Sequence, residues 1–201
     1  MLKFILIVCL IGFLFYILYN RFIKPNLKGN DGKIIQNNGY LLIDTTHTII
    51  SKATNLTLTT VGIGFILLII VLVLAIKIKI LLFLLPISFY LIGQLFLLSN
   101  HVKTTKKQQI WFNPQNSAVF IEQIDAENIN FNLLNDVRRV REVKSVQNTR
   151  GLFFGYYELI LSHDTIQIPY LVAENPQNKL FLETLHANFK IAVESKLFPI
   201  I

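Results

Sequence analysis

The sequence predicts an α-helical membrane protein that carries an α+β soluble domain, and three observations lead to this prediction. Hydrophobic residues make up 53% of the 201 residues and charged residues only 15%, against roughly 25% charged in ordinary soluble domains. The most apolar stretches form three long segments in the first half of the chain. After residue 100, charged residues become frequent and apolar residues alternate with polar ones, which is typical of strands.

The composition also excludes other classes of protein. A chain of this size buries only about two-thirds of its surface on folding, so a fully soluble protein would leave too much apolar surface in water. Disorder is excluded by the same values, and a disulfide scaffold by the single cysteine, Cys9. Eight Lys/Arg against two Asp give residues 1–99 a net charge of +6, and eleven against ten give residues 100–201 a net charge of +1. This distribution indicates membrane topology rather than nucleic-acid binding.

The first predicted span comprises residues 4–19, within a transmembrane region of residues 1–23. Its residues are apolar or aromatic apart from Gly12, and Lys3 and Arg21 flank it. A span needs about 17–25 residues. A cleaved signal peptide is the alternative, but no small-residue cleavage site follows. We therefore expect an uncleaved membrane anchor.

Two further spans, residues 56–76 and 80–99, are predicted to form a helical hairpin within residues 56–100. A single continuous helix would be about 66 Å long, which is twice the thickness of the hydrocarbon core. The spans contain no Asp, Glu, Arg or His, which argues against an ion-coupled transporter acting alone. We expect Gly62, Gly64 and Gly93 to allow close packing of the helices. The amide of Gln94 is expected to make a helix-packing contact, with a place in a transport pathway as the alternative.

A polar loop, residues 24–55, connects the first two spans. Turn-forming Gly and Asn pairs interrupt it, and we expect short strands at residues 40–43 and 48–50, then a helix over residues 51–60. Because a hairpin returns the chain to the same side of the membrane, this loop and residues 101–201 must share a side. Eight cations lie near the spans on that side and three on the other, which predicts that the C-terminal domain is cytoplasmic.

Residues 101–201 are predicted to form a soluble domain of six or seven short strands followed by one amphipathic helix. The helix begins at Pro176 and has an apolar face formed by Phe181, Leu185 and Phe189. The strands are expected where apolar residues alternate between turn signals, at residues 109–112, 117–123, 128–133, 137–149, 156–162 and 165–171.

The segments IDAENINFNLLNDVRRVREV and YYELILSHDTIQIPYL, followed by the helix from Pro176, are antiparallel strands closed by a terminal helix. In this order, residues 124–189 resemble the bacterial pleckstrin-homology-like (PH-like) domain of small membrane proteins, which often follows a two-helix hairpin. The resemblance implies a small β-barrel or sandwich with a C-terminal helix. It also implies a binding or assembly module rather than an enzymatic activity.

Two candidate binding features lie in this domain. The first is a basic cluster of five cations within thirteen residues, namely Arg138, Arg139, Arg141, Lys144 and Arg150. It predicts contact with anionic lipid headgroups or a partner, and the alternative is a solvated strand. Phe153 and Phe154 lie in a connection bounded by glycines, which predicts a wedge that enters lipid or a partner. The alternative is that these rings fill the end of the barrel.

No catalytic or metal-binding pattern is present in the sequence. The four histidines, at residues 47, 101, 163 and 186, lack the spacing of metal ligands, and no phosphate-binding glycine loop is found. We therefore expect no enzymatic activity and no cofactor.

The function hypothesis is a non-enzymatic protein of the bacterial inner membrane with three spans and a cytoplasmic PH-like domain. The domain would bind partner proteins or the membrane surface in a scaffold or accessory role. Its expected partners are membrane lipids and other integral membrane proteins. The alternative is a small accessory subunit of a larger membrane transport or secretion complex.

Overall fold

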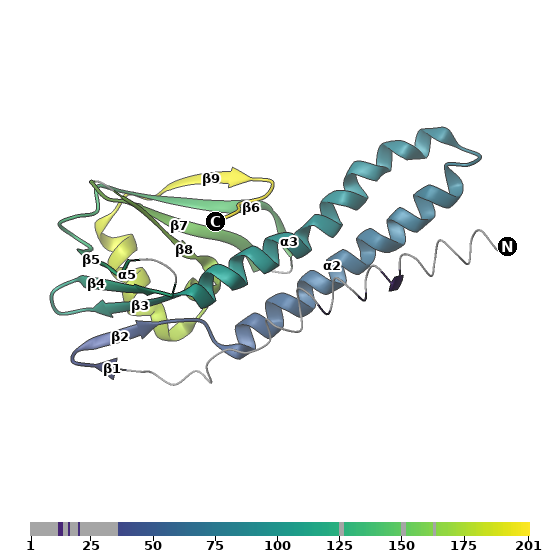
Figure 1. Cartoon of the computed structure of the whole chain (residues 1–201). Coiled ribbons are helices and arrows are strands. Elements are labelled where there is room, and N and C mark those ends of the chain that lie inside the picture. The colour runs from purple at the N-terminus through teal and green to yellow at the C-terminus, as the bar shows by residue number, and fades with distance from the viewer. Residues whose placement is uncertain are drawn as a thin grey trace.

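The computed structural model describes residues 36–124, 127–149, 152–162 and 164–201, together with residues 12, 13, 16 and 20. The described chain forms a β domain of two sheets, from which two long helices project side by side (Figure 1). The first predicted span, residues 1–23, lies outside the described residues apart from the four isolated positions.

The two helices are α2, His47–Leu74, and α3, Leu85–Lys107, which is preceded by the 3-10 turn η3, Lys79–Leu84. Helix α2 begins earlier than the predicted span because Thr46 caps it: the Thr46 hydroxyl accepts a hydrogen bond from the Ile49 N–H at 3.3 Å. The strand predicted at residues 48–50 is therefore wrong, since these residues form the first turn of α2. The helix predicted over residues 51–60 is confirmed.

Both helices are long and apolar enough to cross a membrane. Only 33% and 22% of their most apolar stretches are buried, whereas the core helix of a soluble protein would bury most of such a stretch. Large side chains on their outer halves are exposed, as in Ile66, Phe83 and Phe89. The apolar surface of the hairpin therefore faces its surroundings instead of a protein core.

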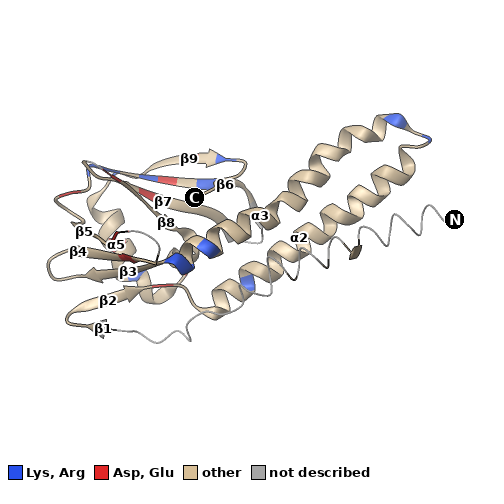
Figure 2. Cartoon of the chain, in the orientation of Figure 1, with Lys and Arg blue, Asp and Glu red and all other residues tan. Residues whose placement is uncertain are grey.

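Charged residues lie at both ends of the hairpin (Figure 2). Lys52 and Lys103 are at the end nearest the β domain, and Lys77 and Lys79 are in the turn at the tip. Lys79 and Lys103 are about 36 Å apart at ~1.5 Å per helical residue, and no charged residue lies between them. This length slightly exceeds the roughly 30 Å of a hydrocarbon core.

The first sheet has five antiparallel strands in the order β1-β2-β3-β4-β5. These are β1 Gln36–Asn37, β2 Tyr40–Ile43, β3 Gln108–Asn113, β4 Ala118–Gln123 and β5 Ile129–Asn132. The strands predicted at residues 40–43, 109–112, 117–123 and 128–133 are confirmed. Residues 36–43, which the sequence analysis assigned to a polar loop, instead belong to the domain, because Leu42 pairs with Trp111 and Ile43 with Ile110.

The second sheet has the order β8-β7-β6-β9. Its strands are β6 Arg139–Thr149, β7 Leu152–Ile160, β8 Thr165–Pro169 and β9 Ala192–Lys196. A short helix, α4 (Tyr170–Ala173), follows β8, and a 3-10 turn, η4 (Pro176–Asn178), leads into α5 (Lys179–Asn188). The predicted helix is thus present, but it is not terminal: β9 follows it and pairs parallel to β6.

Two apolar clusters hold the β domain together and join it to the helices. The main cluster lies between the sheets and α5, where the rings of Phe112 and Phe181 pack edge-to-face at 5.2 Å. The second cluster joins α2 and α3 to β7 and α4 and includes Ile50, Leu98 and Phe154. The helices are therefore packed against the domain instead of being linked to it by a flexible tether.

The predicted packing residues of the hairpin differ in what surrounds them. A Cβ on Gly64 would lie 2.8 Å from Leu91 Cβ, so this glycine does allow a close approach of α2 and α3. Gly62 has no described atom within 4 Å of such a Cβ, and Gly93 lies against the ring of Phe198 instead of a helix. Gln94 is buried, and its Nε2 donates to the carbonyl oxygen of Tyr90 in its own helix at 3.4 Å.

We expect the substitution Gly64→Ala to destabilise the hairpin by about 1–3 kcal/mol, because the new methyl group overpacks the helix contact. Gly62→Ala is the matched control: it is on the same helix with the same change in helix propensity, and its Cβ meets no described atom. Thermal unfolding in detergent, followed by circular dichroism, measures the difference. Equal melting temperatures for the two variants would show that the helices do not meet at Gly64.

Candidate functional site

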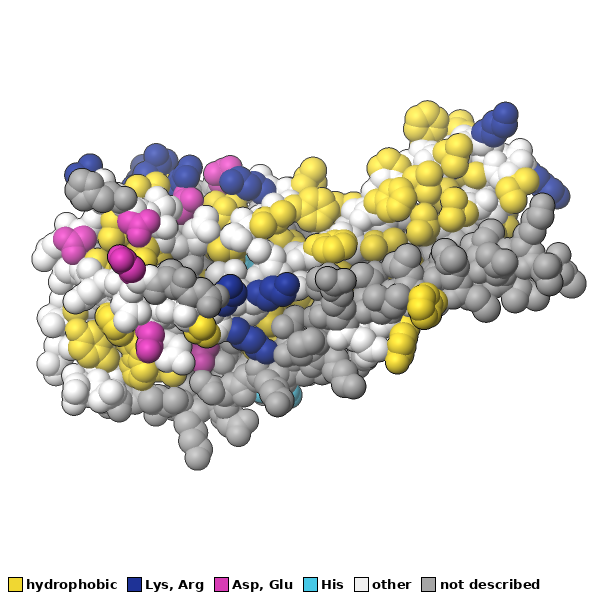
Figure 3. Space-filling model, viewed as in Figure 1, with side chains coloured by type: hydrophobic (Ala, Val, Ile, Leu, Met, Phe, Trp, Pro, Cys, Tyr) yellow, Lys and Arg dark blue, Asp and Glu magenta, His cyan; other side chains and the backbone are white. Residues whose placement is uncertain are grey.

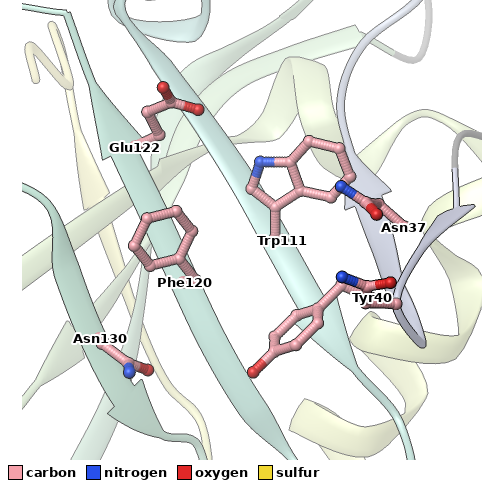
Figure 4. A pocket seen from close by; sticks show the side chains of 7 residues that line it. Asn37, Tyr40, Trp111, Phe120, Glu122 and Asn130 are labelled. Carbon is pink, nitrogen blue, oxygen red and sulfur yellow. The ribbon is translucent and has the colours of Figure 1, made fainter.

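The strongest candidate for a binding site is a hollow of about 360 Å³ on the outer face of the five-stranded sheet. The side chains of Tyr40, Trp111 and Phe120 project from three adjacent strands on this face (Figure 4). Polar groups surround the rings, namely Asn37, Asn38, Glu122 and Asn130. The floor of the hollow is thus aromatic and its margin is polar.

Strand alternation explains why these rings face outward. Ile110, Phe112, Val119 and Ile121 point into the main apolar cluster, so Trp111 and Phe120 must point to the opposite face. Trp111 lies opposite Phe120 on the neighbouring strand, and Phe120 lies opposite Asn130. The side chains therefore line up across the sheet.

The turn between β1 and β2 forms one wall of the hollow. Asn38 and Gly39 both have positive φ angles, 48° and 83°, as a two-residue type I′ hairpin turn requires. This turn places Asn37 opposite Tyr40. A residue with a Cβ would be strained at position 39, so the Asn-Gly pair defines the shape of this wall.

The polar groups of the hollow are not used within the described chain. No hydrogen bond or ion pair among the described residues involves the side chains of Tyr40, Trp111, Glu122 or Asn130. The lining includes one carboxylate and no Lys, Arg or His. Such a surface suits a partner that offers apolar groups and hydrogen-bond donors, and it does not suit an anionic headgroup.

The predicted basic cluster on β6 is divided by its surroundings. Arg141 is bound to Glu158 through both Nε, at 2.6 Å, and a terminal nitrogen, and lies 3.9 Å from Glu194. Lys144 Nζ lies 4.0 Å from Glu142. Arg138 and Arg139 are exposed, and Arg150 lies outside the described residues. Arg141 and Lys144 therefore form ion pairs with carboxylates of the same sheet.

The start of β6 also lies far from the helices. Arg139 pairs with Ile160 at the end of β7, whereas Phe154, near the start of β7, packs against α2 and α3. Six residues of strand separate these two levels of β7, which is about 20 Å at ~3.3 Å per residue. Contact of Arg138 and Arg139 with lipid stays a prediction, and it would require the far end of the domain to reach the membrane.

Phe154 is buried, with 4% of its surface exposed. Its ring lies 5.4 Å from the ring of His101 on α3 and belongs to the cluster that joins the helices to the domain. A wedge role for Phe154 is therefore wrong. The side chain of Phe153 lies outside the described residues.

A second group of polar side chains comes from the four-stranded sheet and from α4 and α5. The Tyr170 hydroxyl donates to Glu142, the rings of Tyr157 and Tyr170 are 5.1 Å apart, and the Tyr157 hydroxyl lies 3.3 Å from His186 Nε2. Burial raises the pKa of Tyr157 to about 12, and the charge of Glu142 adds to the increase. Burial and the hydrogen bond to Glu142 raise the pKa of Tyr170 well above its usual range. Both phenols stay protonated at neutral pH, and Tyr170 acts as a structural donor to Glu142.

Within the described ranges, no group of three or more His, Cys, Asp or Glu residues could hold a metal ion. No known family model matches this chain, and no curated protein or solved structure matches it either. The function of the chain is therefore inferred from the geometry of the molecule itself.

Tyr40, Trp111 and Phe120 are candidate site residues that the sequence alone did not reveal. A signal was present: each of the two rings on β3 and β4 lies between apolar residues in an alternating strand, so it occupies a position where a solvent-facing strand normally has a polar residue. What the sequence did not supply was the pairing of β2 with β3, which brings Tyr40 beside them.

The buried phenols predict a loss of stability at alkaline pH. The unfolded chain has tyrosine pKa values near ~10, whereas that of Tyr157 in the folded state is about 12. The unfolded state therefore loses its proton first, and stability is expected to be constant below pH ~10 and to fall as pH rises toward 12. Chemical unfolding at several pH values, with phenolate absorbance recorded in parallel, measures this.

The variant Tyr157→Phe is expected to be less stable at neutral pH but to lose less stability above pH ~10. Tyr40→Phe is the control, because its ring lies on the outer face of the other sheet. A pH dependence that is the same in wild type and Tyr157→Phe would contradict the assignment.

Proposed function

We propose that this chain is a multi-pass protein of the bacterial inner membrane whose cytoplasmic β domain binds a partner protein through the aromatic hollow. The observation that carries the proposal is the set of three rings, Tyr40, Trp111 and Phe120, on one solvent-facing sheet surface within a polar margin. Large aromatic side chains supply much of the binding energy of protein interfaces. We favour a binding role over catalysis because the lining of the hollow has one carboxylate, Glu122, and no His, Lys, Arg or Cys.

The exposed apolar surface of α2 and α3 supports the membrane location. In water, such a surface would drive aggregation, whereas in a bilayer it is solvated by acyl chains. The lysines at both ends of the uncharged stretch are placed to reach the headgroup regions on either side. The first span, residues 4–19, would add a third helix.

The order of elements after the hairpin supports a PH-like module. Antiparallel strands β3 to β8 are followed by the amphipathic helix α5, which inserts Phe181 between the sheets. Two features are additions to the pattern that carried the resemblance: strands β1 and β2 come from before the hairpin, and β9 follows the helix. In this proposal the hairpin is an insertion within the module.

Anchoring makes a weak contact useful. A domain held at the membrane surface meets an integral partner at a high effective concentration, so the hollow needs only modest intrinsic affinity. A partner that belongs to a transport or secretion complex would make this chain an accessory subunit, and the identity of the bound protein decides between that role and a scaffold.

A photo-crosslinking amino acid in place of Phe120 tests the proposed surface in living cells. We expect a covalent adduct with a specific protein, because the side chain at this position forms part of the floor of the hollow. The same amino acid at Leu134, which is 44% exposed in the turn after β5, is the matched control and should give no adduct. Adducts of equal yield at both positions, or none at residue 120, would contradict a binding site in the hollow.

Cysteine labelling tests the topology. In a Cys9→Ser background, Ile78→Cys at the hairpin tip is expected to react with an impermeant maleimide in intact cells, and Leu134→Cys only after the membrane is opened. Both positions are exposed, at 51% and 44%, so accessibility within the protein does not separate them. The reverse pattern would place the β domain outside the cytoplasm, and equal labelling in intact cells would contradict a hairpin that crosses the membrane.

A further inference from the structure

Residues 197–201, which follow β9, lie against helix α3 near the end of its uncharged stretch. The Asn100 amide donates from Nδ2 to the carbonyl oxygen of Ile201 at 2.9 Å and accepts at Oδ1 from the Ile201 N–H at 2.8 Å. His101 Nε2 lies 2.8 Å from the carbonyl oxygen of Pro199. A carbonyl oxygen only accepts, so Nε2 carries the proton. Three hydrogen bonds thus fix this segment on α3.

Phe198 extends the contact along α3 toward the hairpin tip. Its ring lies 5.2 Å from the ring of Tyr90. A Cβ on Gly93 would lie only 3.0 Å from this ring, so the absence of a side chain at residue 93 makes room for it. Gly93 therefore allows close packing, but its neighbour is Phe198 of this segment and not another helix.

The outer surface of the segment is apolar and open. Leu197 is 61% exposed, Ile200 is 62% exposed and Phe198 is 38% exposed. Val146, which is 61% exposed, follows Ser145, and Ser145 pairs with Lys196 at the end of the parallel ladder, one residue before Leu197. Residues 197–201 contain no charged side chain.

This apolar edge lies at the level where the hairpin leaves the domain. Asn100 is about 4.5 Å along the helix from Lys103, and Tyr90 is about 15 Å further toward the tip. Hydrophobic side chains continue from the helical hairpin to the adjoining edge of the β domain (Figure 3). Residues 197–201 thus lie near the boundary between headgroups and acyl chains if Lys103 reaches the headgroups.

We propose that Leu197, Phe198 and Ile200 insert into the lipid on the domain side of the membrane and attach the edge of the second sheet to the bilayer. The inference rests on the proposed membrane-spanning role of α2 and α3. Lipid fits this surface better than a second protein does, because the segment is continuous with the exposed apolar surface of α3 and has no polar side chains for the rim of a protein interface. The contact sets the tilt of the β domain relative to the membrane.

Tryptophan fluorescence of the full chain in nanodiscs tests this contact. The chain has one tryptophan, Trp111, so Leu197→Trp and Phe89→Trp are each made in a Trp111→Phe background. We expect lipids brominated on their acyl chains to quench the tryptophan at residue 197 with a blue-shifted emission, and to quench the one at residue 89, which is in the predicted span and whose native side chain is 59% exposed. Native Trp111, on the far sheet, is the control and should keep its emission.

The two variants separate this inference from the proposed function. Quenching at residue 89 but not at residue 197 would overturn the lipid contact of the segment and leave the hairpin in the membrane. No quenching at either position would overturn both. A blue shift at residue 197 without quenching would show that protein covers the segment, such as a second copy of the chain, and would also overturn the inference. Ile200→Trp repeats the test at a second exposed position in case Leu197→Trp does not fold.

Discussion

The pairing of β2 with β3 is the constraint on which the rest of the structure depends. The helical hairpin is inserted between these two strands: α2 begins shortly after β2, and α3 continues directly into β3. Because Leu42 and Ile43 pair with Trp111 and Ile110, the domain ends of the two helices must be close together. The helices are therefore antiparallel neighbours. Residues 36–43 and the remaining strands also share one side of any membrane that the hairpin crosses, a conclusion that needs no counting of lysines.

The same arrangement makes the joint between helices and domain stiff. No loop separates α3 from β3. In addition, Phe154 of β7 and Leu171 of α4 belong to the same apolar cluster as Ile50 and Leu98 of the helices. A domain on a flexible linker samples many orientations, and a partner must select one of them at an entropic cost. Here the orientation of the aromatic hollow relative to the helices is set by packing, so that part of the cost is already met when the chain folds.

Local signals made much of the fold predictable, and long-range pairing accounts for most of what was not. The hairpin of β3 and β4, the strands of the second sheet and the helix after Pro176 follow from alternation and turn residues in short windows. Strand β9 gave no such signal, because it pairs parallel to β6 across a large sequence separation. The strand expected at residues 48–50 failed because the Thr46 cap converts those residues into helix. The aromatic hollow required the register of β2 on β3, which no single segment encodes.

The positions of the charges show that the cations of the basic cluster differ in their surroundings, which composition alone does not reveal. A cluster of arginines and lysines within thirteen residues looks like a headgroup site when only the sequence is read. In the folded chain, however, Arg141 faces Glu158 and Glu194, which come from other strands. A cation paired with a carboxylate in the same sheet gains little from an anionic headgroup, since exchange of one partner for the other leaves the net interaction nearly unchanged. Lys52 and Lys103, in contrast, lie at one end of an uncharged helical stretch whose length matches a bilayer. The cations at the helix ends thus flank an uncharged stretch, whereas Arg141 is engaged by carboxylates of its own sheet, and lipid contact of the exposed Arg138 and Arg139 stays a prediction.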